Sequence, residues 1–332
     1  MRITHKSNII PYQRNLQNIQ SRRAKEQMRI SSGKYIQEIS DSPKRLVDSK
    51  MLNNRIEQNK KYLDVIELSH KEMLSAEGKL QGISDKLQKI RQLGIDATQT
   101  GNMGNLPSLA VYVKGIIGDI VNDASGDHNG KYLFSGTKTT GASLDKTDEA
   151  SNNMPFEIVE GEKTGDNPSG LRVVFKGNFE DREINKDRYS NEVINQTADE
   201  LFGANGTEMF ENIIEVYNIL AYREDGTKRT DEDTFGRLEV QRLNDLQKKI
   251  GDRINKVDTV TGRNGGMINR FESIRQQMES EIVRMKDLLS LKEDTDVAEA
   301  TLRLQKEESA MQYSLQTGRN LFSNSLFDFL GL

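Results

Sequence analysis

The feature of this sequence that most constrains its fold is a heptad pattern that stays in phase over two long stretches. In the first stretch, apolar residues recur at alternating spacings of three and four, which predicts a helix that buries one narrow stripe. Its two rows are Leu52, Ile66, Met73, Leu80, Leu87 and Tyr62, Ala76, Ile83, Ile90, Ala97. Asp41-Ser42-Pro43 supplies a start signal and Gly101 a stop signal. We therefore expect one helix roughly 85 Å long, at ~1.5 Å per residue.

The second stretch keeps a single heptad frame through residues 240–289. Its rows are Val240, Ile254, Ile268, Ile282, Leu289 and Leu243, Ile250, Val257, Phe271, Met278, Met285. Gly262, Gly265 and Gly266 fall inside it, and each glycine costs ~1 kcal/mol relative to alanine within a helix. The preserved phase favours a continuous helix whose glycines permit close approach of a neighbour. Two helices joined by a hinge are the alternative.

Composition narrows the class of protein. Only 34% of the 332 residues are hydrophobic, 30% are charged and Trp is absent, which favours long amphipathic helices with wide solvated faces over a compact enzyme. Cysteine is also absent, which excludes disulfides and thiolate metal sites. No apolar run approaches the ~18 residues of a membrane span, and no apolar segment follows the N-terminal charges as a signal peptide requires. We expect no membrane insertion.

The charge is distributed unevenly along the chain. Residues 1–34 carry eight basic residues and one acid, so this segment is +7 and the remainder is −11. The basic residues are interleaved with apolar ones such as Ile9, Leu16 and Ile19 rather than gathered in a block. This pattern indicates an amphipathic helix, and we expect no nucleic acid as a partner.

Between the long stretches the periodicity changes from that of helices to that of strands. The expected elements are a helix over 105–125, a strand over 130–136, strands over 156–159 and 171–175, and a helix over 207–222. Polar residues flank the strands of the segment 141–205. We expect this segment to be a small β insertion that contributes little to the stability of the helices.

Both ends of the chain carry an apolar stripe. The C-terminal stripe comprises Val297, Ala300, Leu304, Met311, Leu315, Phe322, Leu326 and Phe329, and the N-terminal one comprises Ile9, Leu16, Ile19 and Ile30. Neither has a partner nearby in sequence, so the two helices must pair with each other or with other molecules. The candidate assembly interface is Ile9, Leu16, Ile19, Leu304, Met311, Leu315, Phe322, Leu326 and Phe329.

Residues that could carry chemistry are scattered. His5, His70 and His128 lie far apart, and none has a histidine or cysteine three or four residues away. The glycine-rich segments 203–206 and 262–266 fit neither the phosphate-loop nor the dinucleotide pattern. We expect no catalytic, cofactor or metal site, and no enzyme activity.

Several short motifs resemble those of one family. Arg29-Ile30-Ser31-Ser32-Gly33-Lys34, followed by Asp41-Ser42-Pro43, looks like the N-terminal signature of the flagellin superfamily. Within it, Pro43, the run Gly130-Lys-Tyr-Leu-Phe-Ser-Gly-Thr137, Pro155-Phe156 and the ending Ser325-Leu-Phe-Asp-Phe-Leu330 are most similar to the hook-filament junction proteins, the hook-associated proteins of type 3. Ser42 and the final Gly331-Leu332 depart from the family pattern.

This resemblance implies a mainly α fold, an elongated rod of long heptad helices with paired terminal helices and a small β insertion. It implies three parts: residues 1–40 with 290–332 as a terminal coiled-coil assembly domain, 41–140 with 206–289 as a helical rod domain, and 141–205 as a variable insertion. The protein would be secreted by flagellar type III export, with an export chaperone, into an external flagellum, or a periplasmic one in a spirochaete.

The implied partners are hook-associated protein type 1, flagellin and further copies of the chain itself, arranged as a ring. Two other functions stay open from the residues alone. One is a flagellin subunit of the filament, and the other is a cytoplasmic coiled-coil scaffold.

Overall fold

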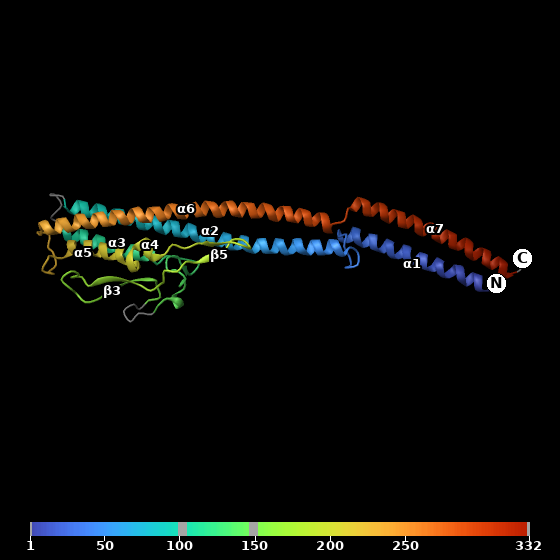
Figure 1. Ribbon diagram of the computed structural model, residues 1–332, viewed down its shortest axis with the longest axis horizontal. Helices are drawn as coiled ribbons and strands as arrows, with labels where there is room; N and C mark the ends of the chain where they lie inside the picture. Colours follow the sequence, from blue (N-terminus) through green and yellow to red (C-terminus); the bar gives the residue numbers. More distant parts are fainter. Residues whose placement is uncertain (1, 99–104, 146–151, 331–332) are drawn as a thin grey trace. The chain divides into compact units, whose positions relative to one another are not determined.

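The computed structural model describes residues 2–98, 105–145 and 152–330, and the side chains of residues 10–98, 105–145 and 152–319 (Figure 1). The helices are α1 (Arg2–Ser32), α2 (Pro43–Thr98), α3 (Leu106–Ala124), α4 (Ala198–Phe202), α5 (Glu208–Ala221), α6 (Arg237–Glu293) and α7 (Val297–Leu330), with short 3-10 turns η2 (Gly141–Ser143) and η3 (Ala204–Gly206). The strands are β1 (Asp127–His128), β2 (Lys131–Tyr132), β3 (Phe156–Glu160), β4 (Leu171–Phe175), β5 (Glu183–Asn185) and β6 (Asn191–Val193).

These strands form three separate antiparallel pairs, β1 with β2, β3 with β4, and β5 with β6. The predicted mainly α fold with a small β insertion is confirmed. Strands β3 and β4 match the prediction, with Phe156 opposite Phe175 and Glu160 opposite Leu171. The predicted strand over 130–136 is shorter, because only Lys131 and Tyr132 pair with β1.

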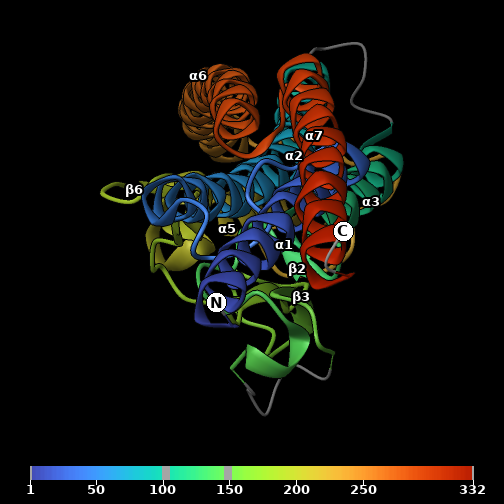
Figure 2. The same cartoon turned by 90° about the vertical axis from the view of Figure 1, so that its right-hand side faces the viewer.

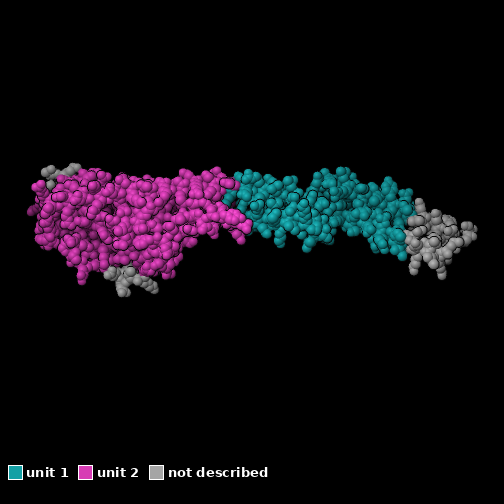
Figure 3. Space-filling view, in the orientation of Figure 1, with its two compact units in different colours: residues 1–60, 278–332 teal, residues 61–277 magenta. Residues whose placement is uncertain are grey.

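The chain divides into two compact units (Figure 3). One comprises residues 1–60 and 278–332, and the other residues 61–277. Helices α2 and α6 contribute residues to both units. The three-part division expected from the sequence is a different partition and stays a prediction.

In the second unit, α2 and α6 pack antiparallel through the predicted heptad rows. Met73, Leu80, Leu87 and their neighbours in the α2 rows are buried, as are Ile250 and Val257 in α6. The Ser84 hydroxyl donates a hydrogen bond of 2.7 Å to the Asp258 carboxylate, and further along the pair the Asn264 amide donates to the Met73 carbonyl oxygen. These rows also close the core beneath α3, α5 and β3.

Helix α6 is continuous through Gly262, Gly265 and Gly266, as the heptad phase predicts. The expected reason for the glycines is not confirmed within the chain, because a Cβ atom at Gly262 or Gly266 would meet open space. The side chain that points inward here is Asn264, only 1% exposed. Its amide nitrogen donates to the Met73 carbonyl and its amide oxygen accepts from Gln196, both at 2.9 Å.

The β insertion shares its core with the helices, and the expectation that it adds little to their stability stays a prediction. Phe156 and Phe202 are fully buried in the same apolar cluster as Phe210 of α5. The ring centroids of Phe156 and Phe202 lie 5.1 Å apart, edge to face, and those of Phe202 and Phe210 lie 5.4 Å apart. Sequence patterning missed this because the strands are too short to reveal which partner their buried face contacts.

The Tyr-Leu-Phe-Ser-Gly-Thr motif fastens this insertion to the end of α3. Leu133 and Phe134 are buried in the core, and Gly136 has φ +68°, a conformation that glycine adopts without steric cost. A Cβ at Gly136 would also overlap Asn178, whose side chain accepts from the Thr137 amide at 2.8 Å. The motif therefore needs glycine both for its backbone conformation and for contact with residue 178.

The hairpin formed by β5 and β6 is tied to the long helices by charges. Arg182 pairs with Glu72 of α2, and both side chains are largely buried. Glu192 pairs with Arg270 of α6 at 2.9 Å and also with Lys186. Neither strand was expected from the sequence, because each has only three residues.

Phe202→Ala should lower the free energy of unfolding by about 3–5 kcal/mol, because it removes a fully buried ring from a shared core. Tyr189→Ala is the matched control, since Tyr189 is an 86% exposed aromatic residue in the same insertion. Urea unfolding followed by the helical circular dichroism signal measures both. Equal, small effects of the two substitutions would support the expectation of a separable insertion.

Candidate assembly interface

Helices α1 and α7 pack against each other in the first unit, as predicted for the terminal helices (Figures 1 and 2). The inward positions follow a heptad spacing on both helices. They are Tyr12, Leu16, Ile19, Arg23, Glu26 and Ile30 on α1, and Ala300, Leu304, Glu307, Met311, Ser314 and Gly318 on α7. We call these twelve residues the terminal seam.

The structure brings together four of the nine predicted interface residues. Ile19 is buried, and Leu16, Leu304 and Met311 are half-buried along the terminal seam. Leu315 is 51% exposed and lies outside the seam. The side chains of Ile9, Phe322, Leu326 and Phe329 lie outside the described residues, although their backbones belong to α1 and α7. Whether these nine residues form an interface between subunits stays a prediction.

Half of the α7 seam, Glu307, Ser314 and Gly318, is polar or lacks a side chain, and the search for apolar periodicity therefore missed these positions. Glu307 accepts a hydrogen bond of 3.0 Å from the guanidinium of Arg22 across the helix pair. On α1, Glu26 and Arg29 form a buried ion pair of 2.7 Å. A three-and-four spacing that admits small and charged residues, rather than apolar ones alone, would have found these positions.

The apolar stripe of α7 and its seam do not coincide. The stripe runs through Val297, Leu304 and Leu315, whereas the small residues of the seam are Ala300, Ser314 and Gly318. At 3.6 residues per turn these two rows lie about 60° apart around the helix. Val297 is consequently 52% exposed, much like Leu315. One flank of the stripe contacts α1, and the other flank is uncovered in the single chain.

One contact of the terminal seam depends on glycine. The Tyr12 hydroxyl donates a hydrogen bond of 3.1 Å to the Ser314 carbonyl oxygen, which places the phenol ring directly over Gly318. A Cβ atom at Gly318 would overlap that ring. Tyr12 is therefore a knob and Gly318 its hole, in the sense used for coiled coils.

Gly318→Ala should loosen the pairing of α1 and α7, because the added methyl group overlaps the ring of Tyr12. Tyr12→Ala in the same chain should relieve the overlap and restore part of the pairing. Amide hydrogen exchange over residues 12–30 measures the effect, with faster exchange expected in Gly318→Ala than in the double variant. Additive effects of the two substitutions would show that the residues do not meet.

A compact joint connects the terminal helices to α2 and α6 within the first unit. Helix α1 ends at Ser32, and the next residue, Gly33, has φ +69°, as expected for a glycine after a helix C-terminus. The Thr295 amide donates to the Gly33 carbonyl oxygen at 2.8 Å, and the Tyr35 amide donates to that of Glu293 at 2.7 Å. These bonds hold the two linkers side by side around an isolated antiparallel β-bridge between Lys34 and Asp294. The linkers are about 260 residues apart in sequence, and their backbone groups are paired with each other.

Cationic side chains surround the aromatic ring at the centre of this joint. The guanidinium carbons of Arg29 and Arg45 lie 4.2 and 4.5 Å from the ring centroid of Tyr35. Arg29 also donates to the Tyr35 carbonyl oxygen at 3.0 Å. Because Arg29 belongs to α1 and Arg45 to α2, the ring fixes the angle between these helices by cation–π attraction.

Two carboxylates of the joint are more acidic than usual. Lys34 donates to Asp294 at 2.7 Å, which with a bond from Ser290 holds the pKa of Asp294 below its ordinary value and raises the pKa of Lys34. Burial raises the pKa of Asp41, but hydrogen bonds from Lys25 and from the Gln37 and Glu38 amides outweigh burial and lower it. The segment Asp41-Ser42-Pro43 was expected to start α2, which begins at Pro43, and the Asp41 carboxylate also holds the linker.

Acid should open the joint. Because both carboxyls have a lower pKa in the folded joint than in the unfolded chain, they stabilise it above the ordinary Asp pKa of about 3.9. That stability is lost as the pH falls through the folded pKa values. The chain contains no Trp, so Tyr35→Trp provides a single fluorophore at the joint. Its emission should hold steady down to about pH 4 and change below it.

In the same Tyr35→Trp background, Lys25→Gln with Lys34→Gln should move this transition to higher pH, because the carboxyls lose the cations that keep them ionised. Lys114→Gln removes an exposed cation of α3 and is the matched control. An unchanged midpoint in the double lysine variant would show that these ion pairs do not govern the joint.

Other chemistry is not visible in the described parts of the chain. Across residues 2–98, 105–145 and 152–330, no helix is long and apolar enough to cross a membrane. The same residues contain no group of three His, Asp or Glu side chains placed to hold a metal ion.

Comparison with known proteins finds one matching family region and several solved structures of similar fold. Residues 3–139 match the bacterial flagellin N-terminal helical region. None of the curated proteins matches the chain in sequence.

Several solved structures share the fold. A flagellar hook-associated protein of Vibrio parahaemolyticus is 16% identical, with a TM-score of 0.59 over 76% of this chain and 99% of that one. Hook-associated protein 3 of Legionella pneumophila is 11% identical, with a TM-score of 0.56 over 73% and 98% of the two chains. FlgL of Xanthomonas campestris is 11% identical, with a TM-score of 0.53 over 73% and 99%.

These comparisons confirm the resemblance predicted from the sequence. The flagellin match contains the Ser31-Ser32-Gly33 end of α1, the heptad helix α2, and the Tyr-Leu-Phe-Ser-Gly-Thr motif up to Thr137. The chain thus carries a flagellin N-terminal helical region over residues 3–139 and has the fold of solved flagellar hook-associated proteins.

Proposed function

We propose that the chain is a structural subunit of the bacterial flagellum, without enzyme activity, that joins the hook to the filament. The observation that carries this proposal is the helix pair α1 and α7, on a fold shared with hook-associated protein 3, with Val297 and Leu315 of its apolar stripe uncovered. Burying a leucine side chain is worth ~1.5–3 kcal/mol. A stripe left half exposed in the single chain therefore favours burial against neighbouring subunits.

In this role the protein leaves the cell through flagellar type III export, with a dedicated chaperone, and assembles outside the cell. Its neighbours are hook-associated protein type 1 on one side, flagellin on the other, and further copies of itself in a ring. In a spirochaete the same position lies in the periplasm. The proposal rests on the fold, on the match of residues 3–139, and on the motifs quoted above.

A flagellin subunit of the filament is the second candidate, because the matched family region is that of flagellin. Gold-labelled antibody on isolated flagella distinguishes the two. Label confined to the end of the filament next to the hook supports the junction role, whereas label along the whole filament supports flagellin. Absence of label from flagella would contradict both.

Val297→Asp with Leu315→Asp should abolish incorporation at the hook tip, so that flagellin leaks into the medium. Both side chains are half exposed in the single chain, so the variant should keep its helical circular dichroism signal. A carboxylate buried in an apolar contact costs several kcal/mol, roughly 2–7 kcal/mol even for an uncharged polar group.

Ser309→Asp with Gln316→Asp is the matched control, because it adds two carboxylates to the exposed face of α7 away from the stripe. This control should assemble normally. Normal filament growth with Val297→Asp and Leu315→Asp would show that the uncovered flank of the stripe is not an assembly contact.

A further inference from the structure

A cavity in the second unit is lined by the turn between β3 and β4, by the end of α5 with the segment that follows it, and by the beginning of α6. Its volume is about 350 Å³, near the lower end of the ~300–1,000 Å³ that is usual for ligand sites. It therefore has room for one long side chain. The lining residues that matter here are Asp166, Pro168, Asn218, Ile219, Tyr222 and Glu224.

The buried amide of Asn218 has an unpaired oxygen at this cavity. Asn218 is only 5% exposed, and Asn167 fixes its orientation. Because the Asn167 amide nitrogen donates to the Leu171 carbonyl oxygen, the Asn167 amide oxygen is left to accept from the Asn218 amide nitrogen, at 2.9 Å. The Asn218 amide oxygen accepts no hydrogen bond from the described residues. Since Asn218 lines the cavity and Asn167 does not, this oxygen is an acceptor on the cavity side, where it calls for a donor.

The charges of the cavity also call for a donor. Four acidic and two basic side chains line it, and both basic ones are already used within the chain. The internal ion pairs are Arg223 with Asp233, Arg242 with Glu215, and Arg229 with Glu239. Asp166 and Glu224 are exposed and form no ion pair with the described residues. The cavity thus combines a buried neutral acceptor with two unpaired carboxylates.

The walls of the cavity suit the remainder of an arginine side chain. Pro168 and Ile219 offer apolar contact, against which a long cationic side chain can bury its methylene groups. Tyr222 adds an aromatic ring, which stands edge to face with Tyr217 at a centroid distance of 6.4 Å. Guanidinium groups stack on such rings and present their N–H donors in a planar fork.

We propose that this cavity binds the guanidinium group of an arginine side chain from a neighbouring protein chain. The Asn218 amide oxygen accepts one N–H group, and Asp166 and Glu224 balance the charge. The unpaired side-chain groups named above are all acceptors, whereas a guanidinium carries donors alone. Free arginine fits less well, because the carboxylates of Asp166 and Glu224 would repel its own carboxylate. Lysine has a compact charge without a plane to stack on Tyr222.

The inference rests on the proposed function only for the identity of the neighbour, which is another subunit of the flagellum. The chemistry of the cavity is independent of that role. Its failure and the failure of the proposed function can therefore be told apart.

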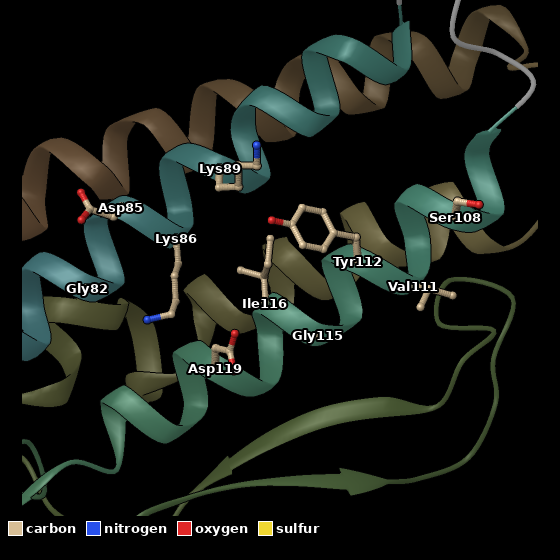
Figure 4. A pocket seen from close by; sticks show the side chains of 10 residues that line it. All are labelled: Gly82, Asp85, Lys86, Lys89, Ser108, Val111, Tyr112, Gly115, Ile116 and Asp119. Carbon is tan, nitrogen blue, oxygen red and sulfur yellow. The ribbon is translucent and has the colours of Figure 1, made fainter.

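The groove between α2 and α3 is a control within the same chain (Figure 4). It is larger, at about 570 Å³, and it too is lined by two exposed carboxylates, Asp85 and Asp119. Lys89 already supplies a cation there, 6.0 Å from the ring centroid of Tyr112. Among the described residues, no side chain that lines this groove has a buried polar atom without a partner. The groove therefore offers similar charge without the buried acceptor.

Binding of a small probe to the purified full chain tests the cavity. N-acetyl-arginine amide carries the guanidinium without a carboxylate, and N-acetyl-citrulline amide has the same shape without the charge. With isoleucine methyl groups labelled for NMR, the arginine probe should shift the Ile219 resonance saturably and leave that of Ile116, in the groove between α2 and α3, in place. Equal shifts with both probes, or no shift of Ile219, would overturn the proposal.

Two double variants with the same change of charge test the residues. Asp166→Asn with Glu224→Gln should weaken binding of the arginine probe by roughly tenfold or more, which corresponds to ~1.4 kcal/mol. All four substituted side chains are exposed, so both variants should keep the fold. Asp85→Asn with Asp119→Asn is the matched control and should bind the probe as the unsubstituted chain does. Equal weakening in the two variants would show that the probe responds to net charge alone and would overturn the proposal.

Incorporation into flagella tests the source of the arginine. Asp166→Asn with Glu224→Gln should be incorporated less than the control variant, because a neighbouring subunit supplies the guanidinium. Normal incorporation of a variant that has lost probe binding would overturn the assignment to a neighbouring chain. If the unsubstituted chain binds the probe but is not found in flagella, the proposed function is wrong and the chemistry of the cavity still stands.

Discussion

The antiparallel packing of α2 against α6 is the interaction on which the rest of the described chain depends. Its heptad rows supply one wall of the core that α3, α5 and the β insertion complete. The register of the two helices is fixed by a polar contact, because the Asn264 amide bonds to both the Met73 carbonyl and Gln196. A shift of one heptad would leave this buried amide unpaired, at a cost of about 1–3 kcal/mol. Stability comes from the apolar rows, and the alignment of the helices from polar contacts such as those of Asn264 and of Ser84 with Asp258.

The apolar periodicity of the sequence correctly predicted the long helices and the faces that they bury. The rows of α2 and α6, and the continuity of α6 through three glycines, follow from apolar residues in phase. Elsewhere the decisive residues are not apolar. Gly318 matters because the ring of Tyr12 covers it, and Glu307 because Arg22 reaches it from a helix 285 residues away in sequence. Short strands such as β5 have no periodicity to detect. Contacts between residues distant in sequence, and glycines that are needed because they lack a side chain, can be identified only from the three-dimensional structure.

The two helix pairs of the chain are built for different tasks. The seam between α2 and α6 is largely aliphatic, whereas the terminal seam includes Glu26, Glu307 and Ser314. A seam of the second kind buries less apolar surface per turn, so the pair it joins contributes less to its own stability. Such a pair can exchange contacts within one chain for contacts between chains at modest cost, as the role proposed for it requires. The contacts of the joint around Tyr35 hold the ends of α1 and α2 together where the terminal seam buries little apolar surface.

The linker bonds from Gly33 to Thr295 also bear on the order in which the chain folds. Joining these residues closes a loop of about 260 residues, and the entropy cost of loop closure grows with its length. That cost falls once the intervening α2 and α6 have packed, because their antiparallel arrangement already brings the two linkers together. Folding should therefore begin in the short-range contacts among α3, α5 and the β insertion, continue along α2 and α6, and reach α1 and α7 last. During that interval the terminal helices are free to meet another molecule first.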